Sequence, residues 1–339
     1  MDIIHRLFED KAKEARLFTD YGFCAEYGGS RSTSFFGGPH VRQGAKFHDI
    51  ASITKMLTHL LILKLAAQKK ICLEDPLDKY VSVPNANGRK LWHLLAFLDE
   101  KHAFYNQYDN FLRGVPSVKK VVMSMGYDDW TKKHHYNNFS SVFLGLVLEK
   151  IFGGTLEEIF HAELCLSEET RYLLFHPQLR GVDSRLVVPT GQDESIRGLP
   201  HDPIARANAH EQLSIAGIFS TADTVAQVFS RNFDFIMRSP IYNLAASNVL
   251  EGVDGGAPPF GLGFDIPLPT RFPGMDLDGP LIFTGHTGSR IFIVRRPRIV
   301  VSILTNTTFC FDPKQDRERR LEYKAFCWKV LTEALRCRD

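Results

Sequence analysis

The sequence predicts an α+β protein: an antiparallel sheet built from both ends of the chain, flanked by terminal helices, with an inserted, mostly helical region. Three observations predict it. Strand-like segments lie near both termini, an amphipathic segment stands outside them at each end, and the middle of the chain carries helical patterns. Because strands and helices are separated along the chain rather than alternating, the class is α+β rather than α/β.

The N-terminal part is predicted to run helix, strand, strand. Residues 2–16 place apolar side chains at helical spacing with charges between them. Residues 18–27 show the alternation of a strand, Gly28-Gly29 forms a turn, and residues 33–36 are the partner strand.

The C-terminal part mirrors this order. Residues 281–284, 290–294 and 299–304 are three short β-rich runs, and the spacing of the last two predicts an antiparallel hairpin. Residues 316–336 are predicted to form a long helix. Its apolar side chains are expected to fall largely on one side: Leu321, Tyr323, Phe326, Trp328, Val330, Leu331 and Leu335.

The middle of the chain is predicted to be mostly helical. Residues 52–68, 138–152, 156–166 and 221–231 have helical character, and loops rich in proline and glycine separate them. We expect residues 1–60 together with 250–339 to form the sheet domain, and residues 61–249 to form the helical one. The cleft between the two domains is then the natural place for an active site.

Composition excludes several classes of function. The 339 residues carry 41 Lys and Arg against 39 Asp and Glu, so the chain is neither a strongly basic nucleic-acid binder nor an acidic disordered protein. The most apolar run, residues 56–67, is interrupted by Lys64 and is too short to span a bilayer. The charged N-terminus lacks the apolar middle of a secretory signal, which predicts a cytoplasmic protein; a chain whose leader had been removed would read the same way.

Cysteines and histidines give no metal site by spacing. The six cysteines are scattered with no Cys-x-x-Cys pair, which predicts free, mostly buried thiols. His134-His135 and His201-Asp202 each lack a third ligand at metal spacing. We therefore expect neither a metal nor a cofactor. For His201 two interpretations stay open, a residue near the cleft and a buried structural histidine, and the second is preferred.

The strongest local feature is Ser52-Ile53-Thr54-Lys55, followed by an apolar helix. Ser52 stands at the helix N-terminus, where unpaired N–H groups and the helix dipole stabilise a developing negative charge. Lys55 projects from the same face within about 5–6 Å, and an amine with a lowered pKa can accept the serine proton. The alternative is structural, because serine is a common N-cap and a lysine in the first turns is usually solvated.

Two other polar motifs strengthen the catalytic interpretation. Tyr136-x-Asn138 directly precedes an apolar helix, for which Asn138 is a plausible N-cap. His286-Thr287-Gly288-Ser289 follows the predicted strand 281–284, so it can form a strand edge that lines a cleft. Gly288 would let the backbone approach a ligand closely.

Each motif is weak by itself, because copies occur elsewhere. A second Ser-x-x-Lys runs from Ser117 to Lys120, among charges and without a long apolar helix behind it. A second Tyr-x-Asn occupies residues 108–110. The order and combination of the three motifs therefore carry the argument.

The combination resembles the signature of the serine β-lactamase and penicillin-binding protein superfamily: Ser-x-x-Lys, a second polar triplet and Lys-Thr-Gly. The branch it resembles has Tyr-x-Asn as the second element and holds class C β-lactamases, D-alanyl-D-alanine carboxypeptidases, D-amino-acid peptidases and related esterases. Residues 73–81, 198–202, 215–223 and 260–264 are also similar to stretches of that branch. The resemblance covers roughly residues 18–306 and implies a β-lactamase/transpeptidase-like fold.

The resemblance also implies roles for individual residues. Ser52 would be the acylated nucleophile and Lys55 its base, and Tyr136 would relay protons to the leaving group and then activate water. The backbone N–H groups of Ser52 and Ser289 would form the oxyanion hole. The implied substrate-binding residues are Asn138, His286, Thr287 and Gly288.

The chain departs from the family in two places. Most relatives read Leu-Leu-x-His-Thr-Ser-Gly where residues 94–100 here read Leu-Leu-Ala-Phe-Leu-Asp-Glu, so the substrate wall beside the cleft should differ. The third motif begins with His286 instead of lysine. An imidazole is a weaker anchor for a substrate carboxylate than an ammonium group.

The leading interpretation is a serine hydrolase that forms an acyl-enzyme with a small-molecule ester, amide or peptide. Small-ester or D-amino-acid amide hydrolysis ranks ahead of β-lactamase or D-Ala-D-Ala carboxypeptidase activity, because a cell-wall role needs export. An acyltransferase that uses the same acyl-enzyme, and a non-catalytic binding protein that retains the fold, are the alternatives. Neither a nucleic-acid nor a membrane partner is expected, and the sequence does not indicate an oligomeric state.

Overall fold

The structure is a computed structural model of the chain. It describes residues 2–27, 30–36, 47–84, 86, 88–98, 108–125, 133–165, 172–251, 253, 258–267 and 281–337. The predicted turn at Gly28-Gly29 lies outside these residues, as do the last two residues of the divergent segment 94–100.

A five-stranded antiparallel sheet joins the two ends of the chain. Its order is β2-β1-β8-β7-β6, with all neighbouring strands antiparallel. The strands are β1 (Tyr21–Tyr27), β2 (Ser30–Phe36), β6 (Leu281–Thr284), β7 (Arg290–Val294) and β8 (Ile299–Thr305). β1 pairs with β8, so that an N-terminal and a C-terminal strand lie side by side in the middle of the sheet. This confirms the predicted α+β fold, including the β7–β8 hairpin.

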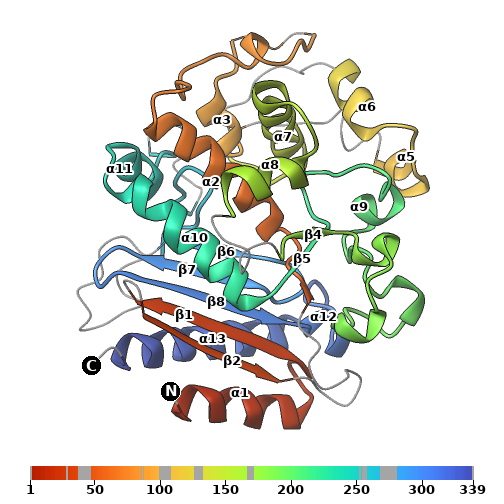
Figure 1. Cartoon of the computed structure of the whole chain (residues 1–339), viewed down its shortest axis with the longest axis vertical. Helices are drawn as coiled ribbons and strands as arrows, with labels where there is room; N and C mark the ends of the chain where they lie inside the picture. Colours follow the sequence, from red (N-terminus) through yellow and green to blue (C-terminus); the bar gives the residue numbers. More distant parts are fainter. Residues whose placement is uncertain are drawn as a thin grey trace.

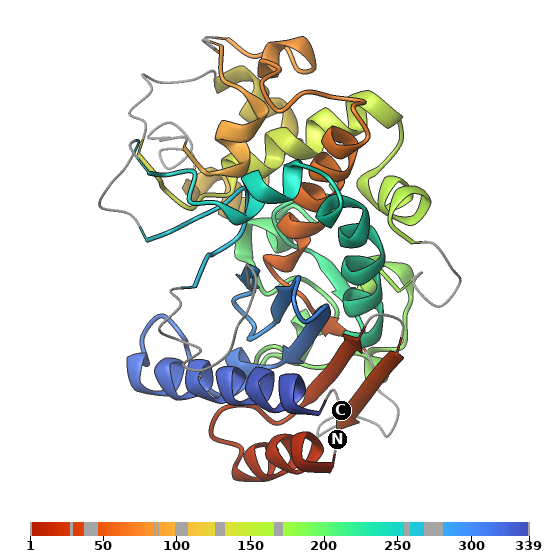
Figure 2. The same cartoon turned by 90° about the vertical axis from the view of Figure 1, so that its left-hand side faces the viewer.

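One face of the sheet is covered by the two terminal helices, α1 (Asp2–Glu14) and α13 (Arg317–Arg336) (Figures 1 and 2). Alternate side chains of β7 enter different cores, one on each face of the sheet, because successive side chains of a strand point to opposite faces. Phe292 and Val294 pack in the core beneath α1 and α13. One residue of the predicted apolar side of α13 is not buried. Leu321 is 52% exposed and faces away from the sheet.

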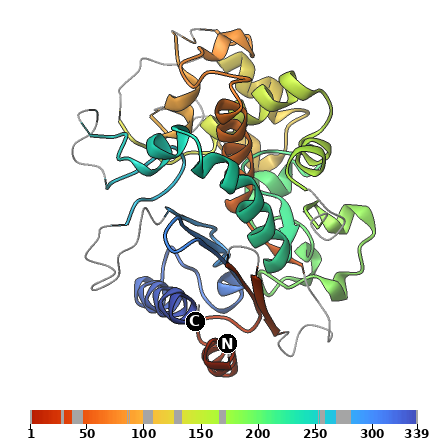
Figure 3. The same cartoon turned by 60° about the vertical axis from the view of Figure 1, so that its left-hand side comes forward.

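The other face packs against α10 (Ala222–Met237), and α2 (Ile53–Ala67) lies beyond it (Figure 3). Ile291 and Ile293 of β7 belong to this core, which continues without a break into the helical region. α10 begins where the sequence predicted a helix and extends beyond the predicted end at Arg231. The division of the chain into a sheet domain and a helical domain remains an interpretation, since a single apolar core runs through both.

The remaining elements form the helical region and a second, smaller sheet. The helices are α3 (Leu91–Leu95), α5 (Tyr108–Arg113), α6 (Val118–Met125), α7 (Phe139–Phe152), α8 (Leu156–Glu163), α9 (Pro203–Ala207), α11 (Ile241–Ala246) and α12 (Thr307–Cys310). Single 3₁₀ turns are η1 (Leu77–Lys79), η3 (Pro177–Arg180), η4 (Ser184–Leu186) and η5 (Glu194–Ile196). A small sheet of order β3-β5-β4 joins β3 (His48–Asp49), β5 (Ile218–Ser220) and β4 (Leu174–Phe175).

All six cysteines are free thiols, as predicted, but the expectation that most are buried is wrong. Cys24 and Cys327 are buried in the sheet and in α13, whereas Cys72 is exposed in the turn after α2 and the other three are half-buried. Among the described residues, no group of three or more His, Cys, Asp or Glu side chains is placed to hold a metal ion.

No single helix in the described part of the chain is long and apolar enough to cross a membrane. α7 and α8 have that length and composition only when they are taken as one segment, and the chain bends by 68° between them.

Candidate active site

Ser52 stands in the turn that leads from β3 into α2. Ala51, immediately before it, has a left-handed backbone with φ of +47°, which is uncommon for a residue with a side chain and re-aims the chain at this point. The Ser52 side chain makes no capping hydrogen bond to α2. Its hydroxyl is therefore not used as an N-cap, and the structural alternative for Ser52 does not hold.

Lys55 lies directly behind the Ser52 hydroxyl. The side chain is only 1% exposed. Its Nζ donates to Ser52 Oγ at 3.2 Å and to the carbonyl oxygen of Ile215 at 2.9 Å. The alternative of a solvated lysine is thus excluded, and the amine is held within proton-transfer distance of the hydroxyl.

Tyr136 completes this group from the segment before α7. Its ring centroid lies 5.2 Å from Lys55 Nζ, and the side chain is 45% exposed. The rings of Phe97 and Phe283 lie 5.0 and 6.3 Å from it, centroid to centroid. The divergent segment 94–100 therefore supports Tyr136 from behind, because Phe97 is fully buried and its carbonyl accepts the N–H of His135.

The start of α7 corrects one detail of the predicted motif. Asn138 was a plausible N-cap, but its side chain makes no capping bond. Asn137 does this instead, since its Oδ1 accepts the N–H of Ser140 at 2.8 Å. The side chain of Asn138 is left to line a cavity beside Tyr136, as the predicted substrate-binding role requires.

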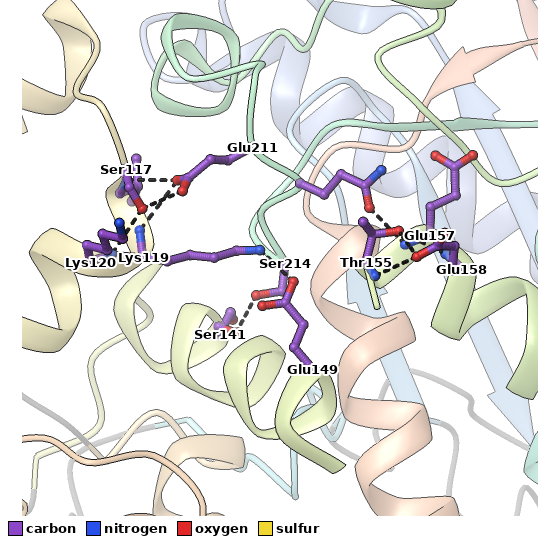
Figure 4. Close-up of polar contacts among 12 residues, drawn as sticks. Ser117, Lys119, Lys120, Ser141, Glu149, Thr155, Glu157, Glu158, Glu211 and Ser214 are labelled. Atoms are coloured by element: carbon purple, nitrogen blue, oxygen red, sulfur yellow. Dashed lines mark hydrogen bonds and ion pairs between the residues drawn. The ribbon is translucent and has the colours of Figure 1, made fainter. Parts of the chain in front are cut away.

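The second Ser-x-x-Lys is structural. Ser117 precedes α6, and its hydroxyl donates to Glu211 Oε1 at 2.5 Å and accepts the N–H of Lys120 (Figure 4). The neighbouring Lys119 pairs with Glu149. The chain therefore brings only the first copy together with a tyrosine and a cavity.

Two cavities meet at the nucleophile. The first, of about 390 Å³, and the second, of about 570 Å³, are both lined by Ser52, Tyr136 and His286. The second also contacts Tyr108, the first residue of α5, which belongs to the repeated Tyr-x-Asn. Tyr108 was not assigned a role from the sequence, because no pattern in the sequence indicates that α5 returns to the cleft.

The third motif lies differently from expectation. β6 ends at Thr284, and residues 285–289 form a tight turn in which the N–H of Gly285 bonds the carbonyl of Ser289. Thr287 and Ser289 are fully buried, and both hydroxyls donate to the carbonyl of Asp49. Neither residue lines the two cavities at Ser52. The predicted roles of Thr287 in substrate binding and of the Ser289 N–H in the oxyanion hole therefore stay predictions that this geometry does not favour.

The cavity edge is formed by the end of β6 and by residues of this turn. Phe283, Thr284 and Gly285 line the first cavity, together with the predicted residues His286 and Gly288. A Cβ placed on Gly285 would lie 2.7 Å from the carbonyl oxygen of Ile50, so this backbone packs directly on the nucleophile turn. The signal in the sequence was present but ambiguous, because Thr-Gly occurs twice, three residues apart.

Two histidines on the cavity wall are held neutral. Burial lowers the pKa of His201 to about 4, and the neighbouring His286 and Arg206 side chains lower it further. Burial also lowers the pKa of His286, and Lys314 lowers it further. The two rings lie 5.4 Å apart and both residues line the second cavity. His201 is therefore a wall residue, which is the less preferred of the two interpretations that the sequence allowed.

Asp49 ties the nucleophile turn to the cavity wall. Its fully buried carboxyl group accepts the N–H of Ala51 at 2.8 Å through Oδ1 and the N–H of His201 at 2.7 Å through Oδ2. Burial raises the pKa of Asp49 to about 6, although both backbone hydrogen bonds act in the opposite direction. The folded protein therefore binds one more proton than the unfolded chain between about pH 4 and pH 6.

The raised pKa of Asp49 makes the free energy of unfolding depend on pH. A folded-state pKa raised above the unfolded value gives stability that is present at low pH and is lost as the pH rises through about 6. From pH 5 to pH 7.5 the loss should be on the order of 1 kcal/mol. Asp49→Asn has no proton to lose, so urea unfolding at the two pH values should show the variant gaining this amount relative to the wild type.

The comparison with the wild type removes the contributions of the buried histidines, which both proteins share. Asp78→Asn, which replaces an exposed carboxylate, is the matched control. A difference between Asp49→Asn and the wild type that stays constant from pH 5 to pH 7.5 would mean that Asp49 is already ionised throughout that range.

Comparisons with known proteins agree with this geometry. The sequence profile of the Beta-lactamase family matches residues 27–325. A search of curated protein sequences finds no match. Many solved structures share the fold. A LovD6 mutant of simvastatin synthase from Aspergillus terreus is 17% identical, with a TM-score of 0.66 over 97% of each chain.

Two other similar structures have related chemistry in their names. A β-lactamase/D-alanine carboxypeptidase from Yersinia pestis, solved with citrate, is 17% identical with a TM-score of 0.64, over 98% of this chain and 99% of that one. EstCE1, described as a hydrolase with promiscuous acyltransferase activity, is 16% identical with a TM-score of 0.60, over 96% and 100%. At these identities the structures establish the fold, and the profile match over most of the sequence shows that the chain belongs to the Beta-lactamase family.

Proposed function

We propose that this protein is a serine hydrolase that forms an acyl-enzyme at Ser52 and cleaves a small-molecule ester, amide or peptide. The observation that carries the proposal is the contact between Lys55 Nζ and Ser52 Oγ, at the point where two cavities meet. A buried amine beside a serine hydroxyl that is free of capping bonds is the arrangement of an activated nucleophile.

Acylation follows from this geometry. Ser52 Oγ attacks the substrate carbonyl carbon, and its proton passes to the Lys55 amine. Tyr136, whose ring lies beside the Lys55 amine, gives a proton to the departing alcohol or amine and is recharged from Lys55. In the second step Tyr136 takes a proton from water while its own phenol proton passes to Lys55. The hydroxide attacks the acyl carbon, and Ser52 leaves with that proton, which Lys55 returns to it.

The negative charge on the carbonyl oxygen needs two N–H donors. The helix N-terminus provides the N–H of Ser52. For the second donor we propose His286 in place of Ser289, since His286 follows the glycine that packs on the nucleophile turn and lines both cavities. In the described part of the chain, neither the Ser52 N–H nor the His286 N–H bonds a backbone acceptor.

An acyltransferase is the second candidate, and one observation favours it. Ser52 lies between two cavities, so an acyl group can remain in one while a second nucleophile enters through the other. EstCE1 carries acyltransferase activity in its description and shares this fold. The β-lactamase and D-Ala-D-Ala carboxypeptidase alternatives, and a binding protein without catalysis, are outcomes of the same experiments.

We expect kcat/KM for p-nitrophenyl acetate and butyrate to exceed kcat/KM for nitrocefin by at least roughly 10-fold at neutral pH. The edge next to Ser52 offers an apolar ring at Phe283 and an imidazole at His286 whose pKa is lowered. A carboxylate held against these two residues therefore meets no ammonium group, and the cations of this cavity, Arg290 and Arg320, lie elsewhere on its wall. An ester needs only the nucleophile, the proton relay and two N–H donors.

The measurement is initial rates with purified protein, including a D-amino-acid amide and an added alcohol as acyl acceptor. Product formed on the alcohol faster than on water supports the acyltransferase. Efficient nitrocefin turnover with negligible esterase activity would make a β-lactamase the better assignment. If no substrate gives an adduct or turnover, the better assignment is a binding protein without catalysis.

A further inference from the structure

His59 is a buried titratable side chain that the proposed chemistry does not use. It lies among mostly apolar residues of α2, and none of its surface is exposed. Neither ring nitrogen has a hydrogen-bond partner among the described residues. Such a ring costs stability, because the hydrogen bonds that it loses to water on burial are not replaced. A polar group at this position therefore calls for an explanation.

His59 shares a helix face with Lys55, because four residues separate them on α2. Side chains of a helix lean towards its N-terminus, which places the imidazole over the turn that carries the lysine. Lys55 is itself buried, and its amine reaches further along the same direction to Ser52. Two buried polar groups therefore lie next to each other behind the nucleophile.

The imidazole of His59 is uncharged. Burial lowers its pKa to about 3, and the neighbouring Lys55 side chain acts in the same direction. A neutral imidazole has one N–H donor and one nitrogen lone pair, and either nitrogen can carry the proton. Because no described partner holds either nitrogen, the ring is free to take the tautomer that turns its lone pair towards a positive charge.

The Lys55 amine becomes short of acceptors during acylation. A lysine ammonium has three N–H donors. The described structure offers two acceptors, Ser52 Oγ at 3.2 Å and the carbonyl oxygen of Ile215 at 2.9 Å. When Ser52 Oγ bonds to the substrate carbon, Lys55 holds the proton and this first acceptor is weakened. A polar neighbour has a large effect on a charge that forms in such a buried place.

Two neighbours hold the His59 ring in position. The backbone of Gly263 packs on its Nδ1 edge, since a Cβ on Gly263 would lie 2.3 Å from that atom. The left-handed φ of +93° at Gly263 also favours glycine there. The ring of Phe97 lies 5.5 Å from the imidazole, centroid to centroid, and Phe97 in turn contacts Tyr136. The imidazole is thus fixed behind both members of the proposed proton relay.

We propose that His59 is a positioning residue that acts through Lys55. Its uncharged imidazole is the polar neighbour that stabilises the Lys55 ammonium while Ser52 is being acylated. The inference deepens the proposed function and rests on it, since Ser52 must be the nucleophile and Lys55 the base. His59 lines neither cavity at Ser52, so its effect should fall on the chemical step rather than on substrate binding.

Replacement by leucine removes the polarity of His59 and keeps most of its volume. His59→Leu should lower kcat for p-nitrophenyl butyrate by about 10- to 100-fold, the scale of a hydrogen bond to a charged group. The rate of adduct formation with a fluorophosphonate should fall by the same factor, because that reaction isolates acylation. KM should stay within about twofold of the wild type. His59→Gln restores an acceptor and should recover most of the rate.

Urea unfolding separates this effect from a loss of folding. His59→Leu should be at least as stable as the wild type, because it removes a buried group without partners. The matched control is Gln227→Leu on α10, which packs against α2. Gln227 is buried, its amide nitrogen has no partner among the described residues, and it lines neither cavity. Its kinetics should match those of the wild type.

A folded His59→Leu with the kcat of the wild type would overturn the inference. Equal losses in His59→Leu and His59→Gln would overturn it as well, because the shape of the ring rather than its polarity would then matter. If His59→Leu does not fold, His59→Met fills the space with a flexible apolar chain and decides by the same criteria. A wild type with neither adduct nor turnover would remove the proposed function and this inference together, whereas an active wild type and an equally active His59→Leu would remove the inference alone.

Discussion

Replacing Ser52 with alanine is expected to lower ester turnover by about 10⁴-fold or more, the scale seen when a catalytic nucleophile is removed. The physical reason is that no other described serine combines a buried amine at 3.2 Å with a cavity on both sides. Intact mass after incubation with a fluorophosphonate should show one adduct on the wild type and none on Ser52→Ala.

The matched control is Ser117→Ala, in the second Ser-x-x-Lys. Its hydroxyl is engaged with Glu211 at the start of α6, so this variant should label and turn over like the wild type, with only a small loss of stability. Labelling that persists in Ser52→Ala, or an adduct that maps to Ser117, would overturn the assignment of the nucleophile.

Lys55→Met and Tyr136→Phe are each expected to lower kcat by at least roughly 100-fold, because each removes a positioned proton-transfer group. Methionine fills most of the volume of the buried lysine, and the main structural cost is the unpaired carbonyl of Ile215, about 1 kcal/mol. Tyr136 is 45% exposed, so loss of its hydroxyl should leave folding nearly unchanged. Steady-state kinetics and thermal unfolding are measured together.

Two comparisons make this prediction specific. Lys120→Met removes the lysine of the second motif, which lies on α6 away from both cavities, and kcat should stay within about twofold of the wild type. Tyr108→Phe removes the hydroxyl of the other Tyr-x-Asn. Full activity of Tyr136→Phe combined with a dead Tyr108→Phe would show that Tyr108 is the proton relay.

The fold was predictable because its signals are local and strong. The amphipathic ends, the β-rich runs beside them and the apolar helix after Ser52 each have a clear periodicity. The sheet is built from both ends of the chain as predicted, and the structure shows that β1 and β8 are the strands that join them. Boundaries were less exact: β1 begins at Tyr21 rather than Phe18, and α10 extends to Met237, because packing on the sheet rather than propensity decides where these elements stop.

The Ser52 end of the site was also predictable, since three residues of spacing on a helix fix which side chains share a face. The part of the site at the end of β6 could not be predicted. The repeated Thr-Gly allows two registers, and only the position of the β6–β7 turn shows that 283–285 form the cavity edge while Thr287 and Ser289 bond Asp49 from the core. A shift of three residues in a strand also reverses which face each side chain takes.

The sequence by itself determined the fold class and the pairing of Ser52 with Lys55, because these depend on periodicity and short spacing. The preference for Tyr136 over Tyr108 came from the resemblance to a known family. Only the tertiary structure decided the register of the third motif, the return of Tyr108 to the cleft and the placing of Arg290 on the cavity wall. These depend on contacts between segments far apart in the chain, and such contacts are fixed by how the sheet, α13 and the helical region pack rather than by any local pattern.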